Sequence, residues 1–149
     1  MKYLVTDTWN GEGYSESDIE ILEVDLYPSG TPKTDKLREK LLKRIIGFGN
    51  LKSIEIDTSS ITYRIDNDCQ DAGVFYYEPL TDDILAVAIF PTICDREVIR
   101  DIETLENYKA LVRKALAEEY HEFDDSEIDG YCVHEDGVNF DKDFILREV

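Results

Sequence analysis

The amino-acid sequence predicts an α+β fold, in which a mostly antiparallel sheet of about six to nine short strands is covered by two helices. Two observations indicate this class: several short segments alternate apolar and polar side chains, and two longer stretches repeat apolar side chains at helical spacing. The helices are expected at about residues 35–46 and 95–120. A chain of 149 residues has the usual size of one domain, so we expect a single domain over residues 1–149.

The first expected element is a strand over residues 2–9, which alternates in the manner of a half-buried strand. Asn10-Gly11 comes next, and this pair is the preferred sequence of a two-residue type I′ hairpin turn. The returning arm is expected over residues 12–26. A hairpin of this register places Trp9 opposite Glu12 and diagonal to Tyr14, so the three side chains share one face, which we predict as an aromatic partner-binding patch.

Residues 27–32 contain two prolines and a glycine, and they are expected to form a loop. Thr34 is expected to cap the first helix, over about residues 35–46, and Gly47 is expected to stop it. Seven of the sixteen basic side chains of the chain lie within residues 33–52. The first helix is therefore expected to present a basic outer face.

Four strands are expected between the two helices. Residues 51–57 and 61–65 alternate on either side of a short polar turn and predict one hairpin. Residues 74–78 and 84–90 predict a second hairpin. The segment 84–90 is almost entirely apolar, which predicts an interior strand that is covered on both faces.

The last third of the chain predicts a long helix and a hairpin. Apolar side chains recur at helical spacing through residues 95–120. Asp136-Gly137 is a second hairpin-turn sequence, and it lies within the C-terminal segment 128–149.

The charge of the chain bears most directly on its function. It has 34 acidic and 16 basic side chains, a net charge of −18, and residues 118–136 hold nine acids and no Lys or Arg. Such a surface is repelled by nucleic acid and by anionic membranes, so we expect neither as a direct partner. Its natural partner is a positively charged protein.

The sequence also indicates in which cellular compartment the protein is found. The chain has no apolar run of the roughly 20 residues that a membrane span needs, and its first residues do not have the pattern of a signal peptide. Its three cysteines are scattered and odd in number, which favours reduced thiols over a disulfide framework. We therefore expect a cytoplasmic protein.

These observations favour an acidic protein-binding module that occupies a basic, nucleic-acid-binding surface of a partner, such as a nuclease. Phage-encoded anti-defence proteins, including anti-CRISPR proteins, and immunity proteins against nuclease toxins act in this manner. The inference is drawn from charge alone. The acidic face that would make the contact is predicted to comprise Glu97, Asp101, Glu103, Glu106, Glu118, Glu119, Glu122, Asp124, Asp125, Glu127, Asp129, Glu135 and Asp136.

A second hypothesis is a divalent-metal-binding protein or a small metal-dependent enzyme that holds Ca²⁺ or Mg²⁺ in acidic loops. The segment that begins at Asp125 resembles the start of an EF-hand loop, with Gly130 at the sharp bend. Its side-chain ligands would be Asp125, Glu127, Asp129 and Asp136. Position three and position twelve depart from the EF-hand pattern, and the residues after Gly137 alternate as a strand does. A second acidic loop contains Asp66, Asp68 and Asp71.

No catalytic signature is present, so we expect a binding protein without a cofactor and not an enzyme. The chain lacks a phosphate-binding glycine loop, a nucleophile elbow and paired CxxC motifs. Cys132 and His134 would share a strand face, where the imidazole is poorly placed to activate the thiol. A third hypothesis is an assembly subunit, in which the basic first helix of one copy meets the acidic face of another.

Overall fold

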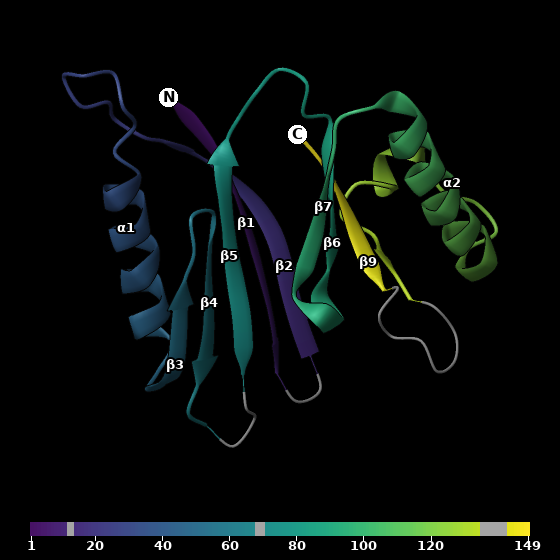
Figure 1. Ribbon diagram of the computed structural model, residues 1–149. Helices are drawn as coiled ribbons and strands as arrows, with labels where there is room; N and C mark the ends of the chain where they lie inside the picture. Colours follow the sequence, from purple (N-terminus) through teal and green to yellow (C-terminus); the bar gives the residue numbers. More distant parts are fainter. Residues whose placement is uncertain (12–13, 68–70, 135–142) are drawn as a thin grey trace. The chain divides into compact units, whose positions relative to one another are not determined.

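The computed structural model describes residues 1–11, 14–67, 71–134 and 143–149. The chain divides into two compact units, Met1–Leu80 and Thr81–Val149 (Figure 1). Among the described residues each unit contains one antiparallel sheet and one α-helix. This confirms the predicted α+β class, while the single domain over residues 1–149 stays a prediction.

The sheet of the first unit has five strands in the order β2-β1-β5-β4-β3, and every neighbouring pair is antiparallel. Its central strand β5 pairs with β1 on one side and with β4 on the other. The five strands are β1 (Lys2–Gly11), β2 (Tyr14–Glu23), β3 (Leu51–Ile56), β4 (Ser60–Ile65) and β5 (Ala72–Pro79).

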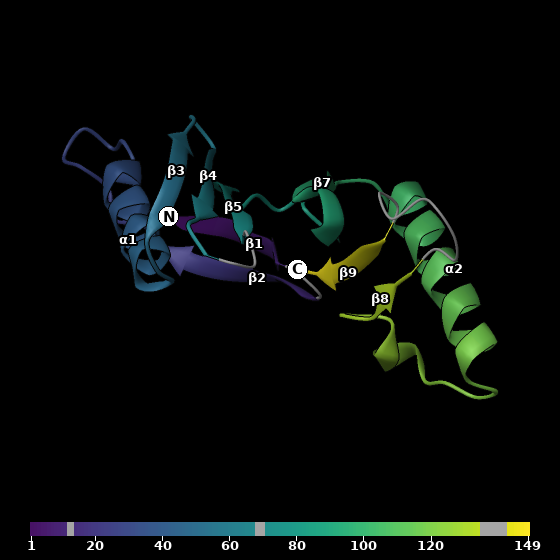
Figure 2. The same ribbon diagram turned by 90° about the horizontal axis from the view of Figure 1, so that it is seen from below.

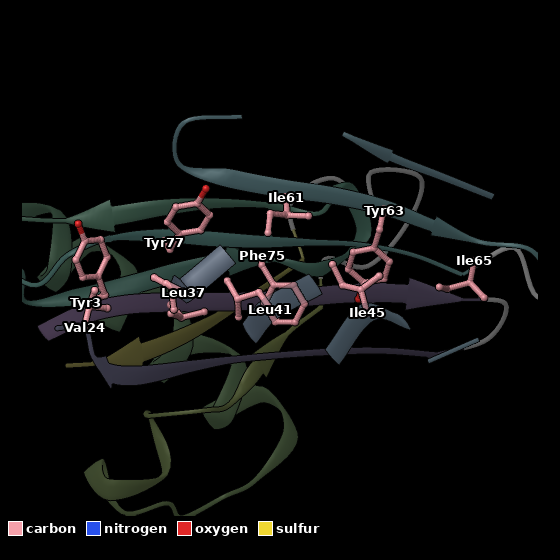
Figure 3. Close-up of a cluster of buried hydrophobic side chains, with 11 residues drawn as sticks. Tyr3, Val24, Leu37, Leu41, Ile45, Ile61, Tyr63, Ile65, Phe75 and Tyr77 are labelled. Carbon is pink, nitrogen blue, oxygen red and sulfur yellow. The ribbon is translucent and has the colours of Figure 1, made fainter. Parts of the chain in front are cut away.

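Helix α1 (Thr34–Gly47) covers one face of this sheet (Figure 2). Its buried side chains Leu37, Leu41 and Ile45 recur every fourth residue and therefore form one stripe. Figure 3 shows this stripe against the side chains that the strands contribute, from Tyr3 at one end of the cluster to Ile65 at the other. Complete burial of one such aliphatic side chain contributes roughly 1.5–3 kcal/mol, so this cluster is a main source of stability for the first unit.

The ends of α1 differ from the sequence prediction by one residue. Lys33 is the N-cap, with no side-chain cap hydrogen bond, and Thr34 is the first helical residue. Gly47 remains inside the helix, and Phe48 is the C-cap. The first turn of α1 is formed by backbone hydrogen bonds from residues 36 and 37 to the Lys33 carbonyl.

The first hairpin has a different register from the predicted one. Trp9 lies opposite Glu16, and Gly11 lies opposite Tyr14, so Asn10-Gly11 belongs to the paired strand β1. Residues 12–13 lie outside the described residues. The expected pairing of Trp9 with Glu12 is therefore wrong. Strand β1 also pairs with β5 as far as Asn10, and this pairing on its second edge holds Asn10-Gly11 in the strand.

The second unit has a four-stranded antiparallel sheet in the order β7-β6-β9-β8. Its strands are β6 (Ala86–Phe90), β7 (Asp95–Ile99), β8 (Cys132–Val133) and β9 (Phe144–Glu148), joined by the 3₁₀ turns η1 (Pro91–Ile93) and η2 (Asp125–Glu127) and by helix α2 (Ile102–Glu119). The expected interior strand is confirmed over a shorter range, because β6 pairs on both edges and its residues 86–89 are all buried. The predicted turn at Asp136-Gly137 lies outside the described residues.

Helix α2 packs on one face of the four-stranded sheet (Figure 2). Its buried residues Val112 and Leu116 meet the small side chains Ala86 and Ala88 of β6, together with Leu146 of β9. The two alanines leave room for the larger side chains of the helix. The exposed surface of α2 carries charged residues together with the apolar side chains of Ile102 and Leu111.

Two topological predictions are wrong. Segments 74–78 and 84–90 do not pair with each other, because β5 belongs to the five-stranded sheet and β6 to the four-stranded one. The predicted helix 95–120 begins only at Ile102, and its first residues form strand β7. Cys94 adopts a left-handed conformation, with φ of 49°, and turns the chain back from β6 into β7.

Within the part of the chain that the structure describes, no helix combines the length and the apolar character that a membrane span requires.

Candidate functional site

Negative charge is concentrated in the second unit. Residues 1–80 contain 15 acidic and 9 basic side chains, which gives a net charge of −6. Residues 81–149 contain 19 acidic and 7 basic side chains, which gives a net charge of −12. The shorter unit therefore has twice the net charge of the longer one.

Helix α2 places part of this charge at its outer face. Because Val112 and Leu116 turn inward, the opposite face exposes Glu103 and Glu118. Lys114 is also exposed there. Glu106 lies toward one flank, with its Oε2 3.8 Å from Nη1 of Arg113.

Two of the predicted acidic residues lie before this helix and not on its face. The Asp101 carboxylate is the N-cap of α2 and accepts hydrogen bonds from the backbone N–H and the hydroxyl of Thr104, both at 2.8 Å. These bonds lower the pKa of Asp101. Glu97 lies on β7, where its carboxylate accepts a hydrogen bond from the Tyr108 hydroxyl. The expectation that both residues lie on a long helix is therefore wrong.

Four further predicted residues stabilise the segment after α2. Asp124 and Glu127 form a capping box around η2. Asp125 lies 3.6 Å from the Arg113 guanidinium, and Asp129 accepts a hydrogen bond of 2.8 Å from the backbone N–H of Glu148. These carboxylates have partners within the unit, so they are poorly suited as free contacts for another protein.

Glu119 also has an internal partner, because it accepts a hydrogen bond from the Tyr131 hydroxyl. This bond raises the pKa of Tyr131 to about 12. Glu119 therefore connects the last turn of α2 to the segment before β8.

Three exposed acids of the predicted acidic face have no such partner. Within the described residues, the side chains of Glu103, Glu118 and Glu122 form no hydrogen bond or ion pair. Glu135 and Asp136 lie outside the described residues. The part of the predicted acidic face that remains open to an external cation is therefore the outer face of α2 and the turn after it.

The hairpin patch differs from its prediction. Trp9 is half-buried against the core of the first unit, and its indole N–H donates to Oε2 of Glu16 at 3.3 Å. Glu12 lies outside the described residues, and the backbone of Tyr14 pairs with Gly11. Glu16 takes the place opposite Trp9 that Glu12 was expected to occupy.

No family model, curated protein or solved structure matches this chain. Its function must therefore be inferred from its own residues.

The predicted metal ligands are dispersed. Among the described residues, no three His, Cys, Asp or Glu side chains are grouped as a metal ion would require. Asp125 and Asp129 meet Arg113 and Arg147 respectively, and η2 occupies the start of the EF-hand-like segment. In the second acidic loop the Asp71 carboxylate accepts a hydrogen bond from an asparagine amide, and Asp66 is exposed, while Asp68 lies outside the described residues.

Cys132 and His134 approach each other next to Asp143. The Cys132 Sγ lies 4.0 Å from Nδ1 of His134, and the Asp143 carboxylate lies 3.3 Å from the same nitrogen. Burial, and then the charge of Asp143, raise the pKa of Cys132 to about 11. The thiol therefore stays protonated at neutral pH and lacks the character of an activated nucleophile.

Proposed function

We propose that this chain is an acidic protein-binding module that occupies a basic, nucleic-acid-binding surface of a partner protein. One observation carries the proposal: Glu103, Glu118 and Glu122 are exposed and without partners among the described residues, in a unit with a net charge of −12. An unpaired carboxylate can meet Lys or Arg of a partner without first breaking an internal hydrogen bond or ion pair, whereas a carboxylate with an internal partner cannot.

The spacing of these acids suits a surface that binds nucleic acid. At 1.5 Å per residue, the 15 steps from Glu103 to Glu118 cover about 22 Å along the helix axis. Duplex DNA presents a series of phosphates over the same length, at one charge per roughly 1.7 Å. A helix with carboxylates at both ends can therefore reach Lys and Arg residues that otherwise hold a phosphate backbone.

This mode of binding assigns the protein to a functional class. An acidic module that covers a basic groove excludes nucleic acid from it, as inhibitors of defence nucleases and immunity proteins for nuclease toxins do. The proposed partner is a nuclease or another nucleic-acid-binding protein, and the proposed effect is inhibition.

Affinity capture with competing duplex DNA tests the proposal. The immobilised protein is incubated with nuclease-treated bacterial lysate, and retained proteins are eluted with salt or with DNA. We expect nucleic-acid-binding proteins that elute at moderate salt and that duplex DNA displaces, because both contacts use the same cations.

Two charge-matched variants locate the surface. The first converts Glu103, Glu118 and Glu122 to glutamine. The control converts three exposed acids of the first unit to amides: Asp25, Glu55 and Asp66. At roughly 0.2–1 kcal/mol for each exposed ion pair, the first variant should bind about 3-fold to 100-fold more weakly, and the control should bind as the wild type does. Equal losses in the two variants, or retention that DNA leaves unchanged, would refute the proposal.

The assembly alternative makes a different prediction. If α1 of one copy meets the acidic face of another, the mass measured by light scattering must rise at low salt and fall at high salt. A monomer at low salt would exclude it without affecting the inhibitor proposal.

A further inference from the structure

We propose that a cavity at the hairpin end of the five-stranded sheet binds the guanidinium group of an arginine side chain. The cavity has a volume of about 280 Å³ and is lined by Trp9, Glu16, Phe48, Tyr63, Ile65 and Asp71. It belongs to the first unit, so it goes beyond the function proposed for α2 and does not depend on it.

The register of the strands brings the lining residues of this cavity together. Glu16 lies opposite Trp9, Trp9 lies opposite Gly73, and Gly73 lies opposite Tyr63. These four residues form one row across β2, β1, β5 and β4, on the face that α1 covers elsewhere. Because α1 ends at Gly47, this end of the face is not covered by the helix.

Two glycines let lining side chains lie close to the strands. A Cβ atom on Gly73 would lie 2.3 Å from the hydroxyl oxygen of Tyr63 and 2.4 Å from its Cζ, so the Tyr63 ring lies directly across the glycine. A Cβ atom on Gly11 would likewise lie 2.0 Å from Oδ1 of Asp71, so this carboxylate lies against Gly11. Figure 3 shows Tyr63 and Ile65, which both line the cavity, toward one end of the core cluster.

Aromatic rings form the walls. The rings of Phe48 and Tyr63 have centroids 6.0 Å apart, and the indole of Trp9 lies on β1, two strands from Tyr63. Aromatic faces attract cations through their quadrupole, and Trp does so most strongly. Phe48 is 53% exposed although it is a large apolar side chain, so a ligand that covers it would also gain hydrophobic burial.

Two carboxylates give the cavity a negative charge, and no basic side chain among the described residues that line it neutralises them. Glu16 accepts the indole N–H of Trp9, and Asp71 accepts the side-chain amide of Asn67 through Oδ2 at 2.9 Å. The other oxygen of Asp71, Oδ1, is buried and has no hydrogen-bond donor within the described residues. No Lys or Arg of the described chain lines the cavity, so the carboxylates of Glu16 and Asp71 have no basic partner among its lining residues.

Size and shape select the guanidinium group. A volume of about 280 Å³ is at the lower limit for ligand pockets and suits one side chain better than a cofactor. Guanidinium is planar, stacks on aromatic faces and donates two parallel hydrogen bonds to a carboxylate, whereas an ammonium group is a strongly hydrated point charge. An arginine of a basic polypeptide therefore fits both the ring walls and the carboxylates.

Fluorescence gives a direct test, because Trp9 is the only tryptophan of the chain. The full-length protein is titrated with N-acetyl-arginine amide, with its neutral analogue N-acetyl-citrulline amide, and with N-acetyl-lysine amide. We expect a saturable change in Trp9 emission with the arginine compound and at least about tenfold weaker binding of the citrulline and lysine compounds. No change with the arginine compound, or binding of the citrulline or lysine compound as tight as that of the arginine compound, would overturn the assignment.

Substitutions then distinguish binding in the cavity from general attraction to the negative surface. Asp71→Asn should weaken arginine binding at least about tenfold, because it removes a carboxylate that a guanidinium would meet. Glu55→Gln removes one exposed charge from β3 and should leave binding unchanged. Phe48→Ala removes an exposed wall of the cavity while the buried core stays intact, and it should also weaken binding. Equal affinities of Asp71→Asn and Glu55→Gln would overturn the proposal, provided that circular dichroism shows both variants folded.

A failure of arginine binding at the cavity can be distinguished from a failure of the function proposed for α2. The glutamine variant of Glu103, Glu118 and Glu122 should bind N-acetyl-arginine amide as the wild type does. Loss of arginine binding in that variant would contradict the placement of the site in the first unit.

Discussion

Replacing Asp7 by asparagine is predicted to stabilise the first unit at neutral and alkaline pH. Asp7 lies on β1 between Val5 and Trp9, on the face that α1 covers, and its Oδ1 is buried without a hydrogen-bond partner among the described residues. Burial raises the pKa of this carboxyl from 3.8 to about 6, and the opposing charge of Arg44 only partly offsets the effect. Arg44 is already committed to a bidentate pair with Glu20.

The magnitude of the stabilisation is set by this shift. Because the folded-state pKa exceeds the unfolded-state value, the folded protein binds the proton more tightly, and ionisation of Asp7 lowers the free energy of unfolding as pH rises from 3.8 to 6. A shift of about two units corresponds to about 3 kcal/mol. Asparagine cannot ionise, so its advantage should grow from about 1 kcal/mol at pH 4.5 to about 3 kcal/mol at pH 8.

Urea unfolding followed by Trp9 fluorescence measures this advantage, because the only tryptophan reports on the first unit. Wild type, Asp7→Asn and the exposed control Glu55→Gln are compared at pH 4.5 and pH 8. The control should differ little from the wild type at either pH, as surface substitutions usually do. An Asp7→Asn variant that is no more stable than the wild type at pH 8, or equally stabilised at both values, would refute the reasoning.

Three further substitutions test the packing. Gly73→Ala should destabilise the first unit by about 1–3 kcal/mol, since its Cβ would collide with the buried ring of Tyr63, whereas Gly47→Ala meets open space and should be neutral or stabilising; urea unfolding of both variants checks this contrast. Asp101→Ala removes the N-cap of α2 and should lower the thermal midpoint of the second unit by a few degrees, and an unchanged midpoint would show that the cap is dispensable. Leu116→Ala, at a position only 1% exposed, should cost about 2–5 kcal/mol in urea unfolding followed by circular dichroism, and a loss below about 1 kcal/mol would contradict the packing described for α2.

The sequence predicted the helices and strands better than it predicted which strands pair with one another. Period-two and helical patterns located most strands and both helices, because these patterns are local. The β7 strand was missed because its charged residues Asp95, Arg96 and Glu97 hide the alternation and lead directly into a true helix. The pairing of β5 with β1 and β4 was missed because a pattern shows that a strand exists and not which strand it joins.

The acidic composition of the candidate site could be predicted from the sequence, but the partners of its individual acids could not. The run of acids after residue 118 was visible, but hydrogen bonds and ion pairs decide which acids remain available. Glu97 and Glu119 accept tyrosine hydroxyls, whereas Glu103 and Glu122 have no partner within the described chain. The cavity that we propose as an arginine site could not be predicted from the sequence, since it depends on a register that places Gly73 between two aromatic residues.

Carbodiimide coupling, which joins carboxylates directly to lysine amines, tests the central claim most directly. The protein is coupled to the partner that affinity capture recovers, and the joined peptides are identified by mass spectrometry. We predict links from Glu103, Glu118 and Glu122 to lysines of the nucleic-acid-binding surface, and we predict that excess duplex DNA abolishes them. Links confined to acids of the first unit, or links that DNA leaves unchanged, would contradict the account.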